Sequence, residues 1–297
     1  MQFKKVFFFI ITIGTVATSV AQNKMTPELL WQLGRVGGIG ISKDGKNVLY
    51  NVTIYDTQND SSSTKAYMIP VSGGDAVVVS NADSIIGDDK ISPDGKYIIS
   101  NGMVKLDKVT GSDYYPELTK SNVYIYNSLN YRHWDKWNTG KFDHVFLAPL
   151  INGKPGDKKD LMPGEEFDCP TKPMGGPNDY IWSYDGKQVV YVCKKETGTP
   201  YTISTNTDLY AYNIETGKTT DLTEGMMGYD IEPSYNKKND LAWLSMKTPG
   251  YEADKQDIIV SNGITKINLT KGDDIIQVTG YKWSNDGNNI YGDYIVV

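Results

Sequence analysis

Side chains able to bind or react are most concentrated between residues 103 and 142. This stretch is crowded with Tyr and Trp, and the run Tyr131–Trp137 adds an Arg, a His and an Asp. Aromatic and Arg side chains dominate the binding energy of protein interfaces. Arg132 could bind a carboxylate or a carbonyl oxygen, and Asp135 could accept a free peptide amine. The stretch therefore predicts a peptide-binding surface. Its candidate substrate-binding residues are Arg132, His133, Trp134, Asp135 and Trp137.

This stretch also has a structural interpretation, which the sequence leaves open. In it, Trp134 and Trp137 pack the segment against the rest of the fold, and Arg132 pairs with Asp135. Glu165 and Glu166 form a second candidate substrate-binding site with the same ambiguity. They stand in a segment that is typical of a loop leaving a strand, where charges are usually solvated, and paired carboxylates alone do not indicate glycosidase chemistry.

Residues for hydrolytic catalysis are missing from the sequence. The nucleophile elbow G-x-S-x-G does not occur, and the α/β-hydrolase order of Ser, then acid, then His requires a late His. His133 and His144 are the only histidines. We therefore expect no catalytic residue in this chain. Two cysteines and two histidines are too few to suggest zinc, so we expect no metal and no cofactor. Cys169 and Cys193 could pair or stay free.

The elements that must position these residues are marked by a repeat. The serines of the pattern Ser-x-Asp-Gly stand at positions 42, 92, 183 and 284, and a degenerate copy places a serine at 234. The successive steps are 50, 91, 51 and 50 residues. Asp hydrogen-bonds its own turn backbone, and Gly adopts the positive φ that strains other residues. Each copy thus predicts a strand, a tight turn and a second strand.

A second hairpin follows most copies, so each repeat supplies four strands. Turn signals such as Asn262-Gly263 separate its two β-rich runs. Units of four strands and about 40 to 50 residues are typical of β-propeller blades. The alternative is an unrelated β-sandwich with common Asp-Gly turns. We predict an all-β, incomplete propeller of about four blades plus the start of a fifth. The long step of 91 residues indicates an insertion, residues 103–142, in the second blade.

The ends and the charge of the chain suggest where it acts. Lys4 and Lys5 precede an apolar run, and Ser19-Val20-Ala21 resembles a signal-peptidase site, so we predict a signal peptide over residues 1–21 and export to the periplasm or the outside. An uncleaved membrane anchor is the alternative, but the run is short for a spanning helix. After cleavage we expect no membrane association. The formal net charge of −6 lacks the basic footprint of nucleic-acid binding.

The repeat resembles the propeller motif of two families, the TolB-like periplasmic propellers and the prolyl oligopeptidase family of serine peptidases. Three further segments resemble the dipeptidyl-peptidase five and acylaminoacyl-peptidase branch of the second family. They are Tyr131–Trp137, Pro173–Gly176 leading into Trp182-Ser183, and Ser204–Tyr210. The similarity covers essentially residues 24–297.

This resemblance implies an N-terminal propeller followed by a C-terminal α/β-hydrolase domain, which we expect to be absent from residues 22–297. Its members cleave peptides with a Ser-Asp-His triad, and dipeptidyl peptidases of this broad family hold the substrate amine with propeller acids, a role open to Glu165 and Glu166. We therefore expect the substrate-gating part of an exported serine exopeptidase, with a peptide substrate and its own missing hydrolase domain as partners. The alternatives are a stand-alone TolB-like propeller that binds a protein, a small protein of four to five blades, and a poorly folding fragment.

Overall fold

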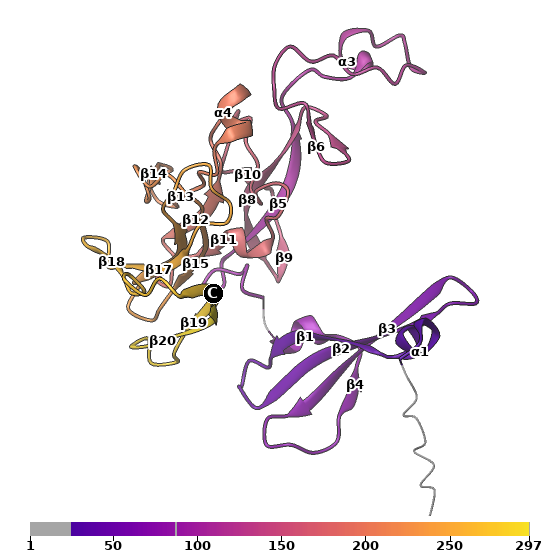
Figure 1. Cartoon of the computed structure of the whole chain (residues 1–297), viewed down its shortest axis with the longest axis vertical. Helices are drawn as coiled ribbons and strands as arrows, with labels where there is room; N and C mark the ends of the chain where they lie inside the picture. The colour runs from indigo at the N-terminus through magenta and orange to yellow at the C-terminus, as the bar shows by residue number, and fades with distance from the viewer. Residues whose placement is uncertain (1–24, 87, 297) are drawn as a thin grey trace, which may run out of the picture. The chain divides into compact units, whose positions relative to one another are not determined.

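Four-stranded antiparallel sheets repeat along the chain in the computed structural model, which describes residues 25–86 and 88–296 (Figure 1). The predicted signal peptide, residues 1–21, lies outside the described residues. The structure divides into two compact units between Asp88 and Asp89. The all-β blades predicted from the repeat are confirmed.

The first unit holds one blade, in which neighbouring strands pair in chain order. Its elements are α1 (Pro27–Gln32), β1 (Arg35–Ile41), β2 (Asn47–Asp56), β3 (Ser61–Pro70), β4 (Val77–Val79) and α2 (Ala82–Ile86). Pro27 begins helix α1 after a Thr26 cap, whose hydroxyl accepts the N–H of Leu29 at 3.1 Å.

The second unit begins with a blade that carries the insertion. Its strands are β5 (Tyr97–Lys105), β8 (Lys141–Ile151), β9 (Lys154–Pro155) and β10 (Lys159–Asp160), and the insertion holds α3 (Gly111–Tyr114), β6 (Arg132–His133) and β7 (Lys136–Trp137). The first strand of this blade is reduced to a single bridge between Ile91 and Ile98 of β5. The insertion therefore joins the second and third strands of the blade.

Two complete blades and a hairpin follow. The third blade contains η1 (Pro177–Asp179), β11 (Tyr180–Trp182), β12 (Gln188–Cys193), α4 (Gly198–Ile203), β13 (Asp208–Asn213) and β14 (Thr219–Asp221). The fourth contains β15 (Asp230–Tyr235), β16 (Leu241–Met246), β17 (Gln256–Ser261) and β18 (Lys266–Asn268). The hairpin pairs β19 (Ile276–Trp283) with β20 (Ile290–Val296).

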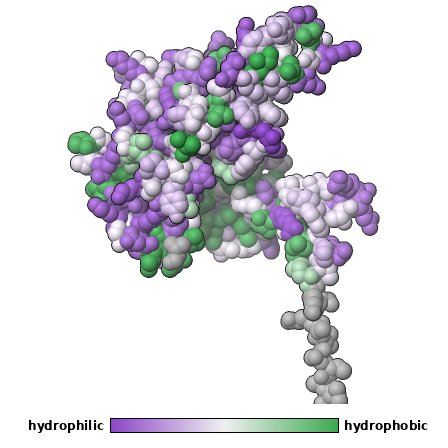
Figure 2. All heavy atoms as spheres, turned by 45° about the horizontal axis from the view of Figure 1, so that its top comes forward, coloured by the Kyte–Doolittle hydropathy of each residue, from purple (hydrophilic) through white to green (hydrophobic). Residues whose placement is uncertain are grey.

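Hydrophobic side chains pack between successive blades of this second unit. Tyr191 and Val145 belong to a cluster shared by the second and third blades, and Leu209 and Trp243 to one shared by the third and fourth. All four side chains are fully buried. Over the face shown in Figure 2, hydrophilic residues predominate and hydrophobic residues are scattered among them in small groups. The core thus lies between the sheets, as expected for blades that stack face to face.

The Ser-x-Asp-Gly turns share one geometry in all four copies. The serine hydroxyl donates to the aspartate at 2.5 to 2.7 Å and accepts the backbone N–H five residues later at 2.9 Å. The glycine has a φ between 69° and 72° in every copy. The turn residues are therefore chosen for a hydrogen-bonded loop with one left-handed position.

The degenerate copy is displaced from the register that its serine suggests. Asn236, not Ser234, occupies the first turn position, since its N–H donates to the carbonyl of Asp240 at 3.0 Å and its carbonyl accepts the N–H of Asn239 at 3.1 Å. Asn239, with φ 65°, takes the place of the glycine. The alignment of Ser234 with the other serines was wrong because Asn can replace both the side-chain acceptor and the left-handed residue.

Turns of successive blades also contact one another in the second unit. The N–H of Asp185 donates to Asn239 Oδ1 at 3.2 Å, and Asn236 Nδ2 donates to the carbonyl of Gly287 at 3.0 Å. The indole of Trp182 donates to the carbonyl of Lys90 at 2.7 Å. The repeat therefore shapes each blade and also joins it to the next.

Candidate functional site

The insertion leaves β5 after Lys105 and returns to β8 at Lys141, so it spans residues 106–140. This is narrower than the predicted range 103–142, because the pairing of β5 with β8 continues to the cross-strand pair Lys105 and Lys141. Gly140 closes the base of the insertion. It has a φ of 71°, and its carbonyl accepts the N–H of Leu106 at 2.9 Å.

The carboxylate of Asp113 fixes the first half of the insertion. Asp113 in α3 accepts the ammonium of Lys105 at 2.5 Å and the backbone N–H groups of Val109 and Thr110 at 2.9 and 2.7 Å. Lys105 first, and then the two N–H groups, hold the pKa of Asp113 well below its usual range. The carboxylate thus ties the insertion to the strand from which it departs.

Four rings form what we call the aromatic cluster: Tyr124, Tyr126, Tyr131 and Trp137. Tyr124 and Tyr126 are almost parallel, at an interplanar angle of 2° and a centroid distance of 6.1 Å. Trp137 lies 5.8 Å from Tyr124 at 14° and 6.1 Å from Tyr126 at 15°. The rings line a pocket of about 520 Å³ together with Ser128 and Leu129.

Hydrogen bonds to and from Asn138 fix the positions of two rings of the cluster. The hydroxyl of Tyr126 donates to the carbonyl of Asn138 at 2.6 Å, and the N–H of Asn138 donates to the carbonyl of Tyr131 at 2.9 Å. Partial burial, and then the neighbouring Tyr124, raise the pKa of Tyr126. The hydroxyl therefore stays protonated at neutral pH and serves as a donor that fixes its ring.

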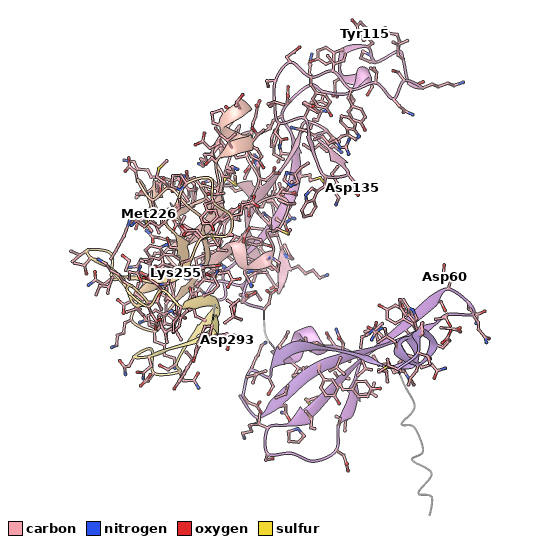
Figure 3. The ribbon with its side chains drawn as sticks, viewed as in Figure 1. Asp60, Tyr115, Asp135, Met226, Lys255 and Asp293 are labelled. Atoms are coloured by element: carbon pink, nitrogen blue, oxygen red, sulfur yellow. The ribbon has the colours of Figure 1, made fainter. Side chains whose placement is uncertain are left out.

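The hairpin β6–β7 carries the candidate residues predicted from the sequence (Figure 3). The guanidinium of Arg132 lies 5.4 Å from the centroid of Trp137, and its Nε donates to the carbonyl of Trp134 at 2.5 Å. Trp134 is 65% exposed and adopts a φ of 50° in the turn, next to Asp135. The ring of His133 lies 5.4 Å from that of Trp134.

The structural interpretation of this hairpin is therefore wrong in its details. Trp134 points into solvent instead of packing the insertion against the blade. Among the described residues Arg132 forms its contacts with Trp137 and Trp134, and no ion pair joins it to Asp135. A two-residue turn places Asp135 at the tip, while pairing of Arg132 with Trp137 across the hairpin brings those two side chains together.

Glu165 and Glu166 occupy a different place. Glu165 forms an ion pair with Lys195 at 2.7 Å, and the ammonium of Lys195 lies 4.0 Å from the centroid of Tyr210. Glu166 is exposed. The contacts of Glu165 thus link the second blade to the third, and its charge is already balanced. The expectation of a merely solvated pair holds for Glu166 but not for Glu165.

His144 is held in the core at both ring nitrogens. It is fully buried, with Nδ1 2.8 Å from Asp160 Oδ2 and Nε2 2.8 Å from the carbonyl oxygen of Glu165. In the next two blades Asp208 and Asp257 stand at the same position of the third strand, and each accepts the hydroxyl of a threonine two residues beyond the end of the fourth, Thr223 and Thr270. His144 therefore does a structural task, and its nitrogens are not available as a base.

The pocket includes residues that sequence reasoning missed. Ser128 and Leu129 line it, although neither has a residue type that suggests binding. Tyr124 and Tyr126 belong to the aromatic stretch, but their role as a wall was not predicted. Their i, i+2 spacing was the available signal, because alternate residues of an extended chain point to one side.

Thiols and possible metal ligands are arranged as follows. Cys169 and Cys193 are both free and buried, and burial raises the pKa of each thiol. Over residues 25–86 and 88–296, no cluster of three or more His, Cys, Asp or Glu side chains could hold a metal ion. The same residues contain no helix long and apolar enough to cross a membrane.

No family model matches this chain. It is 31% identical to dipeptidyl-peptidase 5 of Porphyromonas gingivalis over 90% of this chain and 46% of that protein. It is 32% identical to dipeptidyl-peptidase 5 of Porphyromonas endodontalis over 78% of this chain and 40% of that protein. The chain thus spans about half the length of the curated relatives it matches.

A solved structure shares the fold. The acylaminoacyl peptidase of Pyrococcus horikoshii superposes with a TM-score of 0.57 over 89% of this chain and 43% of that chain, at 10% sequence identity. Such low identity supports the architecture alone. Together with the stacked four-stranded sheets, it supports the assignment of these blades to a propeller.

Proposed function

We propose that this chain admits and positions peptides for a serine exopeptidase without performing catalysis itself. The proposal proceeds from its family: the chain is the β-propeller portion of a prolyl oligopeptidase-family peptidase. The observation that carries the proposal is the 31% identity to a dipeptidyl-peptidase 5 over 90% of the chain. We also propose that the mature protein is exported, on the strength of the leader pattern in residues 1–21.

The chemistry of the described residues supports a binding role. A Ser-His-Asp triad needs a histidine next to its nucleophile. The ring of His144 is buried and hydrogen-bonded to Asp160 and Glu165, and His133 packs on Trp134 at an exposed hairpin. The pocket of the aromatic cluster offers rings instead, and the guanidinium of Arg132 lies beside it against Trp137. These groups suit the binding of a peptide.

The insertion is the element best placed for that role. It connects the second and third strands of its blade, and the corresponding connections of the next two blades, residues 194–207 and 247–255, emerge at the same end of the sheets. A Cβ added to Gly198 in α4 would lie 3.9 Å from the carbonyl oxygen of Leu129, so the insertion and α4 are neighbours. We propose that peptides meet the propeller at this end.

The decisive experiment is to sequence the DNA that follows the codon of Val297. A continuing reading frame that encodes G-x-S-x-G and then an acid and a His supports the proposal. The longer product should then react with a fluorophosphonate and release dipeptides or acylated residues from peptides. Peptides with free and with acylated N-termini distinguish those two activities. A stop codon without such a downstream frame would make the peptidase assignment wrong.

Export has its own test. The protein should be recovered from the periplasm or medium of a bacterial host, and N-terminal sequencing should begin at Gln22. Recovery of the unprocessed chain in the cytoplasm would contradict the export proposal and leave the peptidase assignment unaffected. A protein partner captured by the secreted chain, combined with a stop codon after Val297, would instead favour a stand-alone binding propeller.

A further inference from the structure

The aromatic cluster presents flat ring surfaces in a defined arrangement. Tyr124, Tyr126 and Trp137 lie within 15° of parallel, and Tyr131 is inclined to Trp137 by 24°. Tyr124, Tyr131 and Trp137 remain 41%, 43% and 45% exposed. Aromatic rings of this kind bind planar apolar groups with centroid separations of about 4.5 to 7 Å.

The pocket is large enough for more than one ring. Its volume is about 520 Å³, within the range of about 300 to 1,000 Å³ that is typical of ligand pockets. Leu129 adds an apolar wall, and Ser128 adds a hydroxyl that can donate to or accept from a peptide backbone. An extended peptide could therefore place one side chain on the rings and keep its backbone hydrogen-bonded.

The charge next to the pocket restricts the ligand further. Carboxylates and ammonium groups are absent from the six lining residues, and Arg132 lies against the face of Trp137. Arg132 uses Nε for the carbonyl of Trp134, which leaves its Nη groups for a ligand. The hairpin also carries Asp135 and Lys136, whose opposite charges balance. A cationic side chain would be repelled by Arg132, whereas a carboxylate would be attracted.

From this geometry we propose that the aromatic cluster binds a peptide through an aromatic side chain whose next residue carries a carboxylate. The aromatic ring stacks in the pocket, and the carboxylate binds the guanidinium of Arg132. This inference rests on the proposed peptide-binding role and specifies which peptides the insertion selects. The arrangement resembles a binding hot spot, in which a few aromatic and Arg side chains determine affinity.

The test measures the affinity of the full chain for three probe peptides by calorimetry. The probes are acetyl-Gly-Gly-Phe-Asp-Gly-Gly-amide and its two relatives with Phe replaced by Leu or Asp replaced by Asn. We expect the first to bind at least about tenfold more tightly than the Leu probe, which corresponds to about 1.4 kcal/mol. The preference for Asp over Asn should weaken with rising salt, because the pair is exposed.

Two variants and one control locate the binding. Trp137→Ala should weaken all three probes by at least about tenfold. Arg132→Gln should weaken both probes that carry Asp and leave the Asn probe unchanged. Tyr184→Ala is the matched control, because Tyr184 is an aromatic residue, 50% exposed, on a blade turn outside the insertion. If Trp137→Ala fails to fold, the comparison of the Asp and Asn probes on Arg132→Gln decides.

Several outcomes would overturn the inference. Equal affinity for the Phe and Leu probes would show that the rings do not select the side chain. Equal weakening of the Asp and Asn probes by Arg132→Gln would remove the carboxylate contact. Binding of an oligosaccharide such as cellohexaose at Trp137, without binding of any probe, would replace the peptide by another ligand. The reading frame beyond Val297 tests the peptidase proposal separately, so the two failures are distinguishable.

Discussion

Replacement of Asp230 by Asn should change how stability depends on pH. Asp230 is fully buried at the start of β15. Its Oδ1 accepts the indole N–H of Trp243 at 2.7 Å, while its Oδ2 is buried without a well-formed hydrogen bond among the described residues. Burial raises the pKa of Asp230 from 3.8 to about 7, and Ser245 and Trp243 act in the opposite direction.

The sign of the effect follows from this pKa difference. Between pH 4 and pH 7 the unfolded chain has lost the proton of Asp230, whereas the folded chain still holds it. Unfolding therefore releases a proton, and the free energy of unfolding falls as pH rises through this window. A shift of about three pH units corresponds to a total of about 4 kcal/mol. About 3 kcal/mol of that loss lies between pH 5 and pH 8.

The assay is urea unfolding of the full chain and of Asp230→Asn at pH 5 and pH 8. Asn cannot ionise, and its amide leaves a buried donor that costs about 1 to 3 kcal/mol at every pH. The stability of the parent relative to Asp230→Asn should therefore fall by about 3 kcal/mol from pH 5 to pH 8.

A matched control isolates the buried site. Asp293→Asn makes the same chemical change at an exposed position of β20, and it should show no comparable pH dependence. The reasoning is refuted if the difference between the parent and Asp230→Asn changes by less than about 1 kcal/mol over this range. It is equally refuted if Asp293→Asn reproduces the change.

Two further predictions compare equivalent positions in different surroundings. Ser183→Ala should lower the free energy of unfolding in urea by about 1 to 3 kcal/mol, because the fully buried hydroxyl donates to Asp185 and accepts an N–H of the strand that follows. Ser284→Ala, in a more exposed copy of the turn, should cost less than half as much. Equal costs at the two sites would contradict this. Gly140→Ala should lower the melting temperature strongly, since the added Cβ would lie 2.1 Å from a backbone oxygen. Gly153→Ala, also at positive φ but in open space, should lower the free energy of unfolding by only about 1 kcal/mol. A similar loss at both sites would show that the backbone at the base of the insertion can shift to accommodate the methyl group.

The blades were predictable because their turns combine few residue types at fixed spacing. Ser183, Asp185 and Gly186 each meet a distinct requirement of one hydrogen-bonded loop, so the sequence pattern corresponds to a single geometry. The pattern failed at Asn236, where a different residue satisfies the same hydrogen bonds two positions later. Sequence identity of a motif is thus less informative than the set of donors and acceptors it supplies.

The site was predictable only in part. The aromatic stretch and Arg132 were recognisable by composition, but the contact of Arg132 with Trp137 depends on the register of a two-residue hairpin, and the pairing of Glu165 with Lys195 crosses from one blade to the next. His144 illustrates the same limit. Its structural task became visible only beside Asp208, which stands at the same position one blade later. Long-range pairings of this kind have no local signature.

The contacts between blade turns have a consequence for how such a chain can change. Because Asp185 meets Asn239, and Asn236 meets Gly287, the turns at one end of the blades must keep their length. The connections at the other end range from residues 247–255 to the insertion at 106–140. New sequence can therefore enter there without disturbing the stacking. That end is the natural place to graft a foreign loop or a small domain, with Lys105 and Lys141 as the splice points.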